Sequence, residues 1–212
     1  MKSIVILISG RGSNLPSLFE TDLPVEIKAV ISNRPDAPGL KLAEKYGTTT
    51  RTLDHKQFPT REAFDAALMA EIDAFSPDYV VCAGFMRVLT AGFVNHYRRR
   101  LINIHPSLLP SFPGLHTHRE AIDMGVKIHG CTVHIVTDAL DHGPILIQAA
   151  VPVFPHDTPE VLAARVMQQE HRIYPQALRW LAEDRVEFIS DDVVKIHHSH
   201  VFEASLVSPE LN

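Results

Sequence analysis

This sequence has few cysteines, a small net charge and no long apolar run. Cys82 and Cys131 are its two cysteines, too few for a framework of disulfides, so a reducing compartment, the cytoplasm, is expected. No apolar run reaches the roughly 18 residues that a membrane span requires. The net charge of -5 argues against broad binding to nucleic acid or to anionic membranes.

What is present is the composition of an ordinary soluble protein. Of the 212 residues, 45% are hydrophobic and 21% are charged, a balance typical of globular domains rather than disordered chains. The length suits one large domain or two small ones. Because no clean linker interrupts the pattern, we predict a single domain over residues 1–188, followed by a weakly structured tail over 189–212.

The first half of the chain alternates between strand-like and helix-like segments. Continuous apolar runs predict strands over residues 3–9, 25–32, 49–53, 79–83 and 101–104. Helical spacing predicts helices beginning near residue 15 and over 39–46, 61–75 and 88–97. This alternation predicts an α/β fold with a doubly wound, mostly parallel sheet covered on both faces. Ligands of such sheets lie at the carboxyl ends of the strands.

The second half has a different pattern. Residues 132–137 and 145–153 read as strands, expected to pair antiparallel near a loop that contains Asp141. Residues 158–184 read as a helix, and Pro175 inside it is expected to kink or break that helix. The glycine-containing region 113–130 is a candidate lid. Residues 205–212 are expected to fray.

The strongest chemical signal is a set of three polar groups. Asn103 and His105 lie two residues apart at a strand end, so their side chains can emerge on one side. Asp141 lies in a loop that ends in Gly143 and Pro144. An amide that donates to an oxyanion, an imidazole that handles a proton and a carboxylate that orients the imidazole suit acyl chemistry. With no evident serine or cysteine nucleophile nearby, a direct transfer fits better than a covalent relay.

Two loops at other strand ends offer binding groups. Gly12, Ser13 and Asn14 follow the first strand and open a helix, an arrangement suited to a phosphate monoester, although an ordinary βα turn with Ser13 or Asn14 as N-cap is the alternative. Residues 83–89 follow the fourth strand, and their backbone could bind a flat heterocycle, or simply form a strand-to-helix turn. The histidines at 116–118 and 197–200 lack the carboxylate or cysteine partners of a zinc site, so no metal is expected.

Together these motifs resemble the glycinamide ribonucleotide formyltransferases, folate-dependent enzymes of purine synthesis. The resemblance runs from residue 4 to about residue 185 and rests on the motifs at 8–15, 83–87, 113–118 and 169–171. The wider formyltransferase superfamily shares the Asn–His–Asp set and the segment 105–110. It includes methionyl-tRNA formyltransferases, formyltetrahydrofolate dehydrogenases and formyltetrahydrofolate deformylases. The resemblance implies a Rossmann-like fold with an antiparallel C-terminal extension.

The resemblance also implies a role for each candidate residue. Asn103, His105 and Asp141 would carry the chemistry, with 10-formyltetrahydrofolate as the formyl donor, no metal, and the amine of 5-phosphoribosylglycinamide as the acceptor. The substrate would be bound by Gly12, Ser13, Asn14 and Glu170. The folate would be bound by Arg61, Met86, Arg87, Val88, Leu89 and Asn103. Arg61 also fits the first turn of an exposed helix. The expected partners are these small molecules, with the chain a monomer or a homodimer.

The sequence departs from the family pattern at two positions, and three rival functions stay open. His142 stands where glycine is common, and Ser111 where a basic residue often occurs. The nearest rival is a hydrolase that releases formate from 10-formyltetrahydrofolate with the same three groups, although such relatives usually carry an N-terminal regulatory domain. A transfer-RNA formyltransferase would need an additional RNA-binding domain. A catalytically silent folate- or nucleotide-binding module need not keep all three reactive groups.

Overall fold

The molecule is built around one seven-stranded sheet. The computed structural model describes residues 1–200 and 206–209. The strands of the sheet are β1 (Lys2–Ile8), β2 (Val25–Ser32), β3 (Thr49–Thr52), β4 (Tyr79–Cys82), β5 (Leu101–His105), β6 (Ile128–Ile135) and β7 (Ile145–Pro152). Their spatial order is β3-β2-β1-β4-β5-β6-β7.

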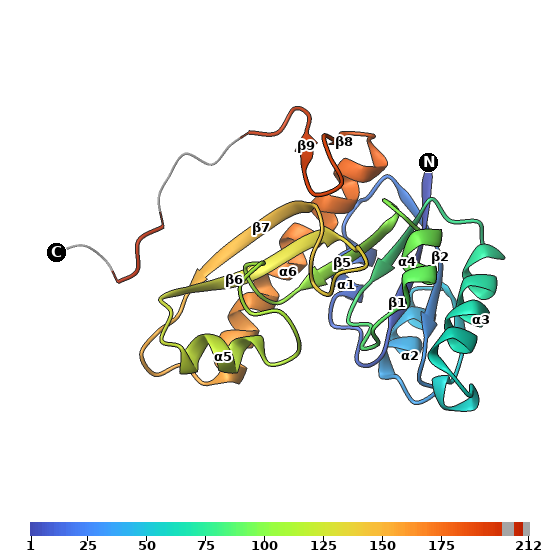
Figure 1. The fold of residues 1–212 in the computed structure, drawn as a ribbon, viewed down its shortest axis with the longest axis horizontal. Coiled ribbons are helices and arrows are strands. Elements are labelled where there is room, and N and C mark those ends of the chain that lie inside the picture. The colour runs from blue at the N-terminus through green and yellow to red at the C-terminus, as the bar shows by residue number, and fades with distance from the viewer. Residues whose placement is uncertain (201–205, 210–212) are drawn as a thin grey trace.

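The chain direction changes once across this sheet. Strands β1 to β5 pair in parallel, whereas β6 is antiparallel to both β5 and β7. The connections run outward from β1 to β3 and then return to β4 on the other side of β1. The boundary between β1 and β4 is therefore the topological switch point, where open α/β sheets bind their ligands. The prediction of a doubly wound, mostly parallel sheet with antiparallel strands added later is confirmed (Figure 1).

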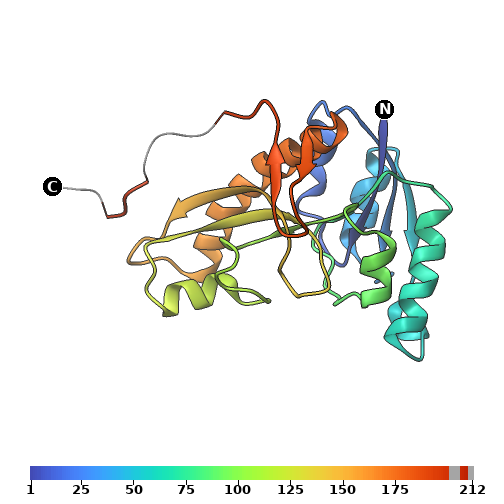
Figure 2. The same ribbon diagram turned by 45° about the horizontal axis from the view of Figure 1, so that its top comes forward.

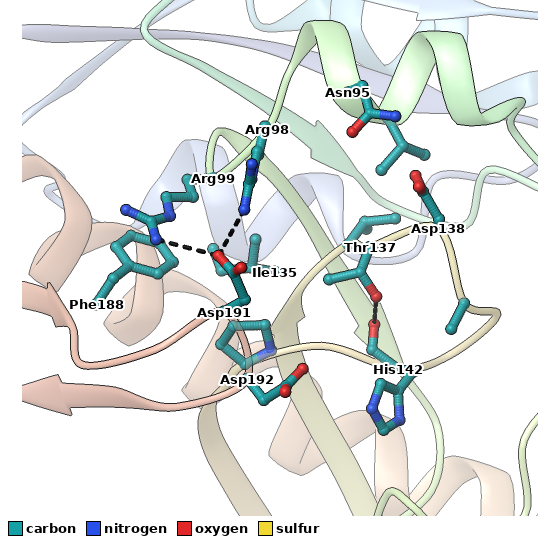
Figure 3. Close-up of a pocket in the computed structure, with 14 residues that line it drawn as sticks. Asn95, Arg98, Arg99, Ile135, Thr137, Asp138, His142, Phe188, Asp191 and Asp192 are labelled. Carbon is teal, nitrogen blue, oxygen red and sulfur yellow. Dashed lines mark hydrogen bonds and ion pairs between the residues drawn. The ribbon is translucent and has the colours of Figure 1, made fainter.

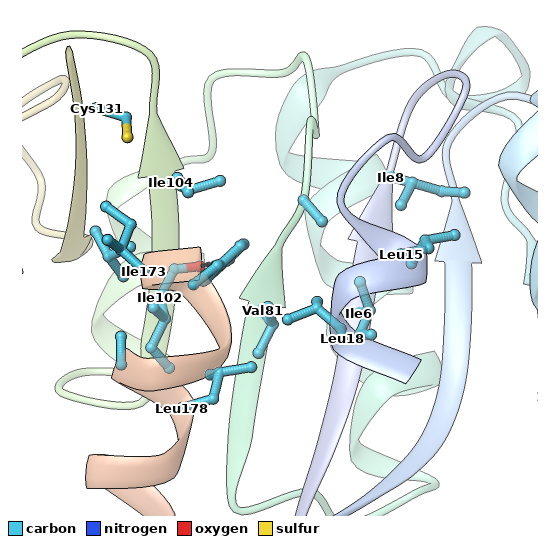
Figure 4. Packing of buried hydrophobic residues seen from close by; sticks show 14 of the residues in the cluster. Ile6, Ile8, Leu15, Leu18, Val81, Ile102, Ile104, Cys131, Ile173 and Leu178 are labelled. Carbon is cyan, nitrogen blue, oxygen red and sulfur yellow. Dashed lines mark hydrogen bonds between the residues drawn. The ribbon is translucent and has the colours of Figure 1, made fainter. Parts of the chain in front are cut away.

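Helices cover both faces of the sheet. The helices are α1 (Leu15–Glu20), α2 (Pro38–Lys45), a short 3-10 turn η1 (His55–Gln57), α3 (Arg61–Asp73), α4 (Ala91–His96), α5 (Thr117–Asp123) and α6 (Pro159–Ala182). Alternate strand residues serve the two faces, since Ile4, Ile6 and Ile8 pack with α1, α2 and α6 while Val5 and Leu7 pack with α3 and α4. Figure 4 shows side chains of α1 and α6 pointing at the strands, and Figure 2 shows α3 and α4 on the other face.

Helix α6 lies within the predicted range 158–184 and runs through Pro175 without a break. The sequence predicts that Pro175 kinks or breaks the helix; the break is wrong, and the kink stays a prediction. A proline inside a helix removes its own N–H from the ladder and crowds the carbonyl four residues earlier, but the side chains of Ile173, Tyr174 and Leu178 around that position are buried in the core. The Tyr174 hydroxyl also donates to the Cys82 carbonyl at 2.8 Å, which ties this part of α6 to the sheet.

Helix α4 begins at Ala91 rather than at residue 88 as predicted. Thr90 is its N-cap, and the Thr90 hydroxyl accepts a hydrogen bond from the Phe93 N–H at 3.3 Å. The apolar spacing of residues 88–97 indicated a helix but could not place this cap. Residues 85–90 consequently form an irregular segment between β4 and α4.

The expected weakly structured tail contains a hairpin. Strands β8 (Val186–Phe188) and β9 (Val194–Ile196) pair antiparallel, so the predicted boundary at residue 188 falls inside this hairpin. Asp191, at its tip, accepts hydrogen bonds from Arg98 at 2.6 Å and from Arg99 at 3.2 Å. The single-domain division itself stays a prediction. Of the segment expected to fray, residues 205 and 210–212 lie outside the described residues.

Across the described ranges 1–200 and 206–209, the helices include none with the length and apolarity needed to span a membrane. The region 113–130, a predicted lid, contains α5, whose Ala121 is buried in the core beneath α6. Whether this region acts as a lid stays a prediction.

Candidate active site

The structure brings His105 and Asp141 together from distant parts of the sequence. His105 is the last residue of β5 and is only 5% exposed. Asp141 lies in the loop between β6 and β7, with its Oδ1 atom 3.4 Å from His105 Nδ1. Its backbone φ of 48° lies in the left-handed region, a conformation that ordinary residues adopt only where the surroundings impose it. The loop is thus shaped so that the carboxyl group reaches the imidazole.

A second segment closes over this pair. The carbonyl oxygen of Phe112 lies 3.0 Å from His105 Nε2, and the Gly114 N–H donates to Asp141 Oδ2 at 2.8 Å. Both ring nitrogens of His105 therefore face oxygen atoms, those of the Phe112 carbonyl and the Asp141 carboxyl group. Sequence analysis placed residues 113–118 in a motif but did not anticipate that residues 112–114 touch the two reactive groups.

Asn103 is oriented by a histidine that sequence analysis missed. Asn103 pairs with His134 across β5 and β6, and Asn103 Nδ2 lies 3.3 Å from His134 Nε2. Burial lowers the pKa of His134 to about 4, so its ring is neutral near pH 7. His134 Nδ1 lies 3.1 Å from the Ile135 carbonyl. A proton on Nδ1 leaves Nε2 to accept from Asn103, whose second amide hydrogen is then free for a ligand. The sequence could not reveal this contact, because it depends on the pairing register of β6 against β5.

The loop after β1 is compact and packs against α2. Gly12 has a φ of 69°, and a Cβ there would come within 2.6 Å of Leu15 Cδ1. The Gly39 N–H donates to the Gly10 carbonyl at 3.0 Å, which ties the loop to the first turn of α2. This packing requires glycine at position 12 independently of any ligand. Ser13 in the same loop is exposed.

Asn14 and Glu170 are in contact although 156 positions separate them in the sequence. Asn14 stands at the N-cap of α1, but its side chain makes no capping hydrogen bond. Its Nδ2 atom donates instead to Glu170 Oε2 on α6 at 3.1 Å. Burial raises the pKa of Glu170, while the bond from Asn14 acts in the opposite direction. Two candidate substrate-binding residues are therefore in contact, and the capping alternative for Asn14 is not what the structure contains.

The four candidate folate residues after β4 differ in their surroundings. Met86 is 67% exposed and Val88 is 55% exposed, so both apolar side chains are accessible to a ligand. The Arg87 guanidinium lies over the Phe64 ring with 4.8 Å to its centroid. Leu89 packs partly into the core. Arg61 is the exposed first residue of α3, so the alternative of an exposed first-turn residue stays open.

The histidines noted in the sequence pack against one another or against acidic and aromatic neighbours. Within residues 1–200 and 206–209, no group of three or more His, Cys, Asp or Glu side chains could hold a metal ion. His118 and His129 pack edge to face at 5.3 Å, and burial lowers the pKa of His129 to about 4. His197 lies 2.7 Å from Glu187 within the C-terminal hairpin.

A pocket of about 420 Å³ adjoins the loop that carries Asp141 (Figure 3). Residues Asp138 and His142 line it from this loop, and Arg98, Arg99 and Asp191 line it from the turn after α4 and from the hairpin. The two arginines and Asp191 already bond to one another there. His142, one of the two departures from the family pattern, is among the residues that line this pocket (Figure 3), whereas Ser111 is an exposed loop residue.

Fold and site define a class of protein: an α/β enzyme of the group-transfer type, with its reactive groups grouped at the ends of β5 and β6. The sequence profile described as formyl transferase matches residues 2–178, which is most of the chain. This chain belongs to the formyl transferase family.

Proteins similar to this chain include enzymes of similar length and a much longer protein. The phosphoribosylglycinamide formyltransferase of Escherichia coli (strain K12) is 51% identical over 189 residues, which cover 87% of this chain and 89% of that protein. The human trifunctional purine biosynthetic protein adenosine-3 is 44% identical over 188 residues, but these cover only 19% of it. The crystal structure of glycinamide ribonucleotide transformylase 1 from Symbiobacterium toebii superposes with a TM-score of 0.89 at 46% identity, covering 92% of this chain and 94% of that one.

Proposed function

We propose that this chain transfers the formyl group of 10-formyltetrahydrofolate to the amine of 5-phosphoribosylglycinamide, a step of de novo purine biosynthesis. The observation that carries the proposal is the contact of His105 with Asp141 at 3.4 Å, two residues from Asn103 on β5, in a chain of the formyl transferase family. The names of its full-length relatives give the acceptor.

The chemistry is an acyl transfer without a covalent enzyme intermediate. The substrate amine attacks the formyl carbon, and the carbonyl oxygen becomes an oxyanion. Asn103 and His105 donate hydrogen bonds to that oxygen, and one such donor is typically worth roughly 100- to 1000-fold in rate. The bond from the formyl carbon to N10 of the folate then breaks, and the proton that the amine loses ends on N10.

Asp141 orients the imidazole and takes part in this proton movement. It lies beside His105 Nδ1, so it favours the cationic imidazole that donates to the oxyanion. The proton passes from the amine through Asp141 or an ordered water, and such catalysis contributes roughly 100- to 10,000-fold. For His105 to donate through Nε2, the Phe112 carbonyl must leave that nitrogen. Segment 112–114 therefore has to shift when the substrates bind.

We propose the following binding roles for the two loops. Gly12, Ser13 and Asn14 hold the phosphate, and Glu170, already bonded to Asn14, contacts the ribose or the glycinamide. Met86, Arg87, Val88 and Leu89 frame the pterin, with Arg61 and Asn103 as further folate contacts. Holding the amine in line with the formyl carbon supplies much of the rate by avoiding the entropy of encounter. We also propose a cytoplasmic enzyme without a metal, present as a monomer or a homodimer.

The decisive experiment follows the absorbance of 10-formyltetrahydrofolate with purified protein, in the presence and absence of 5-phosphoribosylglycinamide. We expect turnover that requires the amine and yields no formate. Equal turnover without the amine, with release of formate, would instead identify a hydrolase acting through the same three groups.

A further inference from the structure

The segment Met86–Thr90 has no regular secondary structure, although it carries four of the candidate folate contacts. It lies between the end of β4 and the N-cap of α4. A binding surface on an irregular segment is useful only if the segment is already held in its bound shape, because disorder lowers the apparent affinity in proportion. Something outside the segment must therefore hold it.

One end of the segment is held by Ser9. The Met86 N–H donates to the Ser9 hydroxyl at 2.7 Å, and that hydroxyl donates in turn to Asn33 Oδ1 at 2.5 Å. The Ser9 N–H also donates to the Gly84 carbonyl at 3.0 Å. Ser9 and Asn33 are both buried. The chain thus crosses from β4 over the end of β1 with its backbone bonded to a side chain that is itself fixed.

The other end is held by Asp65. Asp65 lies on α3, is 1% exposed, and accepts a hydrogen bond from the Thr90 N–H through Oδ2 at 2.7 Å. Thr90 in turn caps α4. Between the two ends, Arg87 lies over the ring of Phe64, the neighbour of Asp65 on α3.

A purely structural role explains the identity of Asp65 poorly. Its Oδ1 atom is buried and has no hydrogen-bond partner among the described residues, and an unpaired buried polar atom costs free energy. A smaller polar residue could accept one hydrogen bond without that cost. The carboxyl group reaches across from α3 to the segment, so its benefit lies in where it holds Thr90.

We infer that Ser9 and Asp65 are positioning residues that fix the two ends of segment 86–90 and thereby set the affinity of the enzyme for the formyl folate. The inference rests on the proposed function, since it takes this segment as the pterin site. Neither side chain touches the reacting atoms. Their loss should therefore affect folate binding far more than the use of the amine substrate.

The test compares Asp65→Ala with Asp65→Asn. Alanine removes the acceptor of the Thr90 N–H, whereas asparagine keeps an acceptor oxygen at nearly the same place. With a net hydrogen bond lost at one end of the segment, we expect Asp65→Ala to raise the KM for 10-formyltetrahydrofolate roughly tenfold. We expect the KM for 5-phosphoribosylglycinamide to change less than about twofold, and Asp65→Asn to restore most of the folate affinity. Glu71→Ala, which removes another α3 carboxylate that bonds only to surface Arg51, is the matched control.

A second measurement needs no substrate. Amide hydrogen exchange followed by NMR on the ligand-free protein reports the Met86 and Thr90 N–H groups directly. We expect Asp65→Ala to speed exchange at Thr90 and at residues 87–89, and Ser9→Ala to speed it at Met86, while amides in β1 and α6 keep their protection. A variant that merely weakens the fold would lose protection throughout.

The outcomes separate the two hypotheses. If the wild type turns over 10-formyltetrahydrofolate only with the amine, but Asp65→Ala leaves the folate KM unchanged or raises both KM values equally, the positioning role is wrong and the proposed function stands. If the wild type neither binds nor turns over the folate, the proposed function fails. In that case the exchange data alone show whether Ser9 and Asp65 hold the segment.

Discussion

At the scale of single residues, the contact between His105 and Asp141 carries the sharpest prediction. In Asp141→Asn, the amide carbonyl can still accept from the Gly114 N–H, but the side chain no longer supports a cationic imidazole at His105. We expect kcat to fall by roughly 100-fold or more with little change in melting temperature, measured by the absorbance assay and by thermal unfolding. Asp138→Asn, an exposed position in the same loop, should stay close to wild type. Near-normal turnover in Asp141→Asn would refute the assignment.

Residues whose chemical type suggests a role could be predicted from the sequence. Contacts that depend on which residues are neighbours in space could not. Asn103, His105 and Asp141 were proposed from their chemistry, and the structure places His105 beside Asp141 and two residues from Asn103 on β5, while their catalytic roles stay predictions. His134 was not found, because its role depends on standing opposite Asn103 in the antiparallel register of β5 and β6. The contact of Phe112 with His105 was missed for the same reason, since it is made by a backbone carbonyl that any residue would supply.

At the scale of elements, the loop between β6 and β7 depends on Gly143. Its φ of 136° is unfavourable for residues with a side chain, and an added Cβ would overlap the carbonyl of Ile135. We expect Gly143→Ala to displace the loop and with it Asp141, so that kcat falls at least tenfold, on the order of a lost catalytic contact. Crystallography or the activity assay can test this.

The matched control for that substitution is Gly92→Ala on α4. Its nearest neighbour is the Thr90 hydroxyl, 3.9 Å from the added Cβ, and its φ is not positive. We expect unchanged turnover and a stability gain of up to about 1 kcal/mol from better helix propensity. If both glycine variants lost activity alike, the special geometry of Gly143 would not be the cause.

The predicted ends of helices were correct where the spacing of apolar residues and a capping residue indicated the same position. Helix α3 begins at Arg61 as predicted, because Thr60 accepts from the Ala63 N–H as its N-cap. The start of α4 was misplaced by three residues because the signal there is tertiary, a bond from the Thr90 N–H to Asp65 on another helix. Pro175 was overrated as a helix breaker, because the core packing of α6 outweighs one missing hydrogen bond.

At the scale of the whole molecule, two buried histidines make folding depend on pH. Burial lowers the pKa of both His129 and His134 to about 4, from an ordinary value of 6.5. Between those values the unfolded chain binds more protons than the folded protein, so stability is full above about pH 6.5 and is lost as pH falls toward 4. Each such group contributes up to about 1.4 kcal/mol per pH unit in that window. Urea unfolding at several pH values measures this slope.

Replacing His129 tests how much this residue contributes to the loss of stability at low pH. Its ring packs edge to face with Phe112 and His118, and neither ring nitrogen has a hydrogen-bond partner among the described residues. His129→Phe keeps an aromatic ring there but removes the titrating group. We expect a shallower loss of stability between pH 6.5 and 4 than in the wild type. An unchanged slope would place the acid sensitivity elsewhere.

The sequence by itself determined the alternation of strands and helices, the two-sided core and the chemical identity of the reactive groups. These depend on hydrophobic period and on residue type, which are local properties of the chain. The tertiary structure alone decided which residues meet: Asn14 with Glu170, Asn103 with His134, and Asp65 with Thr90. Such pairs are separated by tens of residues, and their contacts depend on strand register, helix placement and loop shape. No local pattern encodes these, because they arise only when the whole core packs at once.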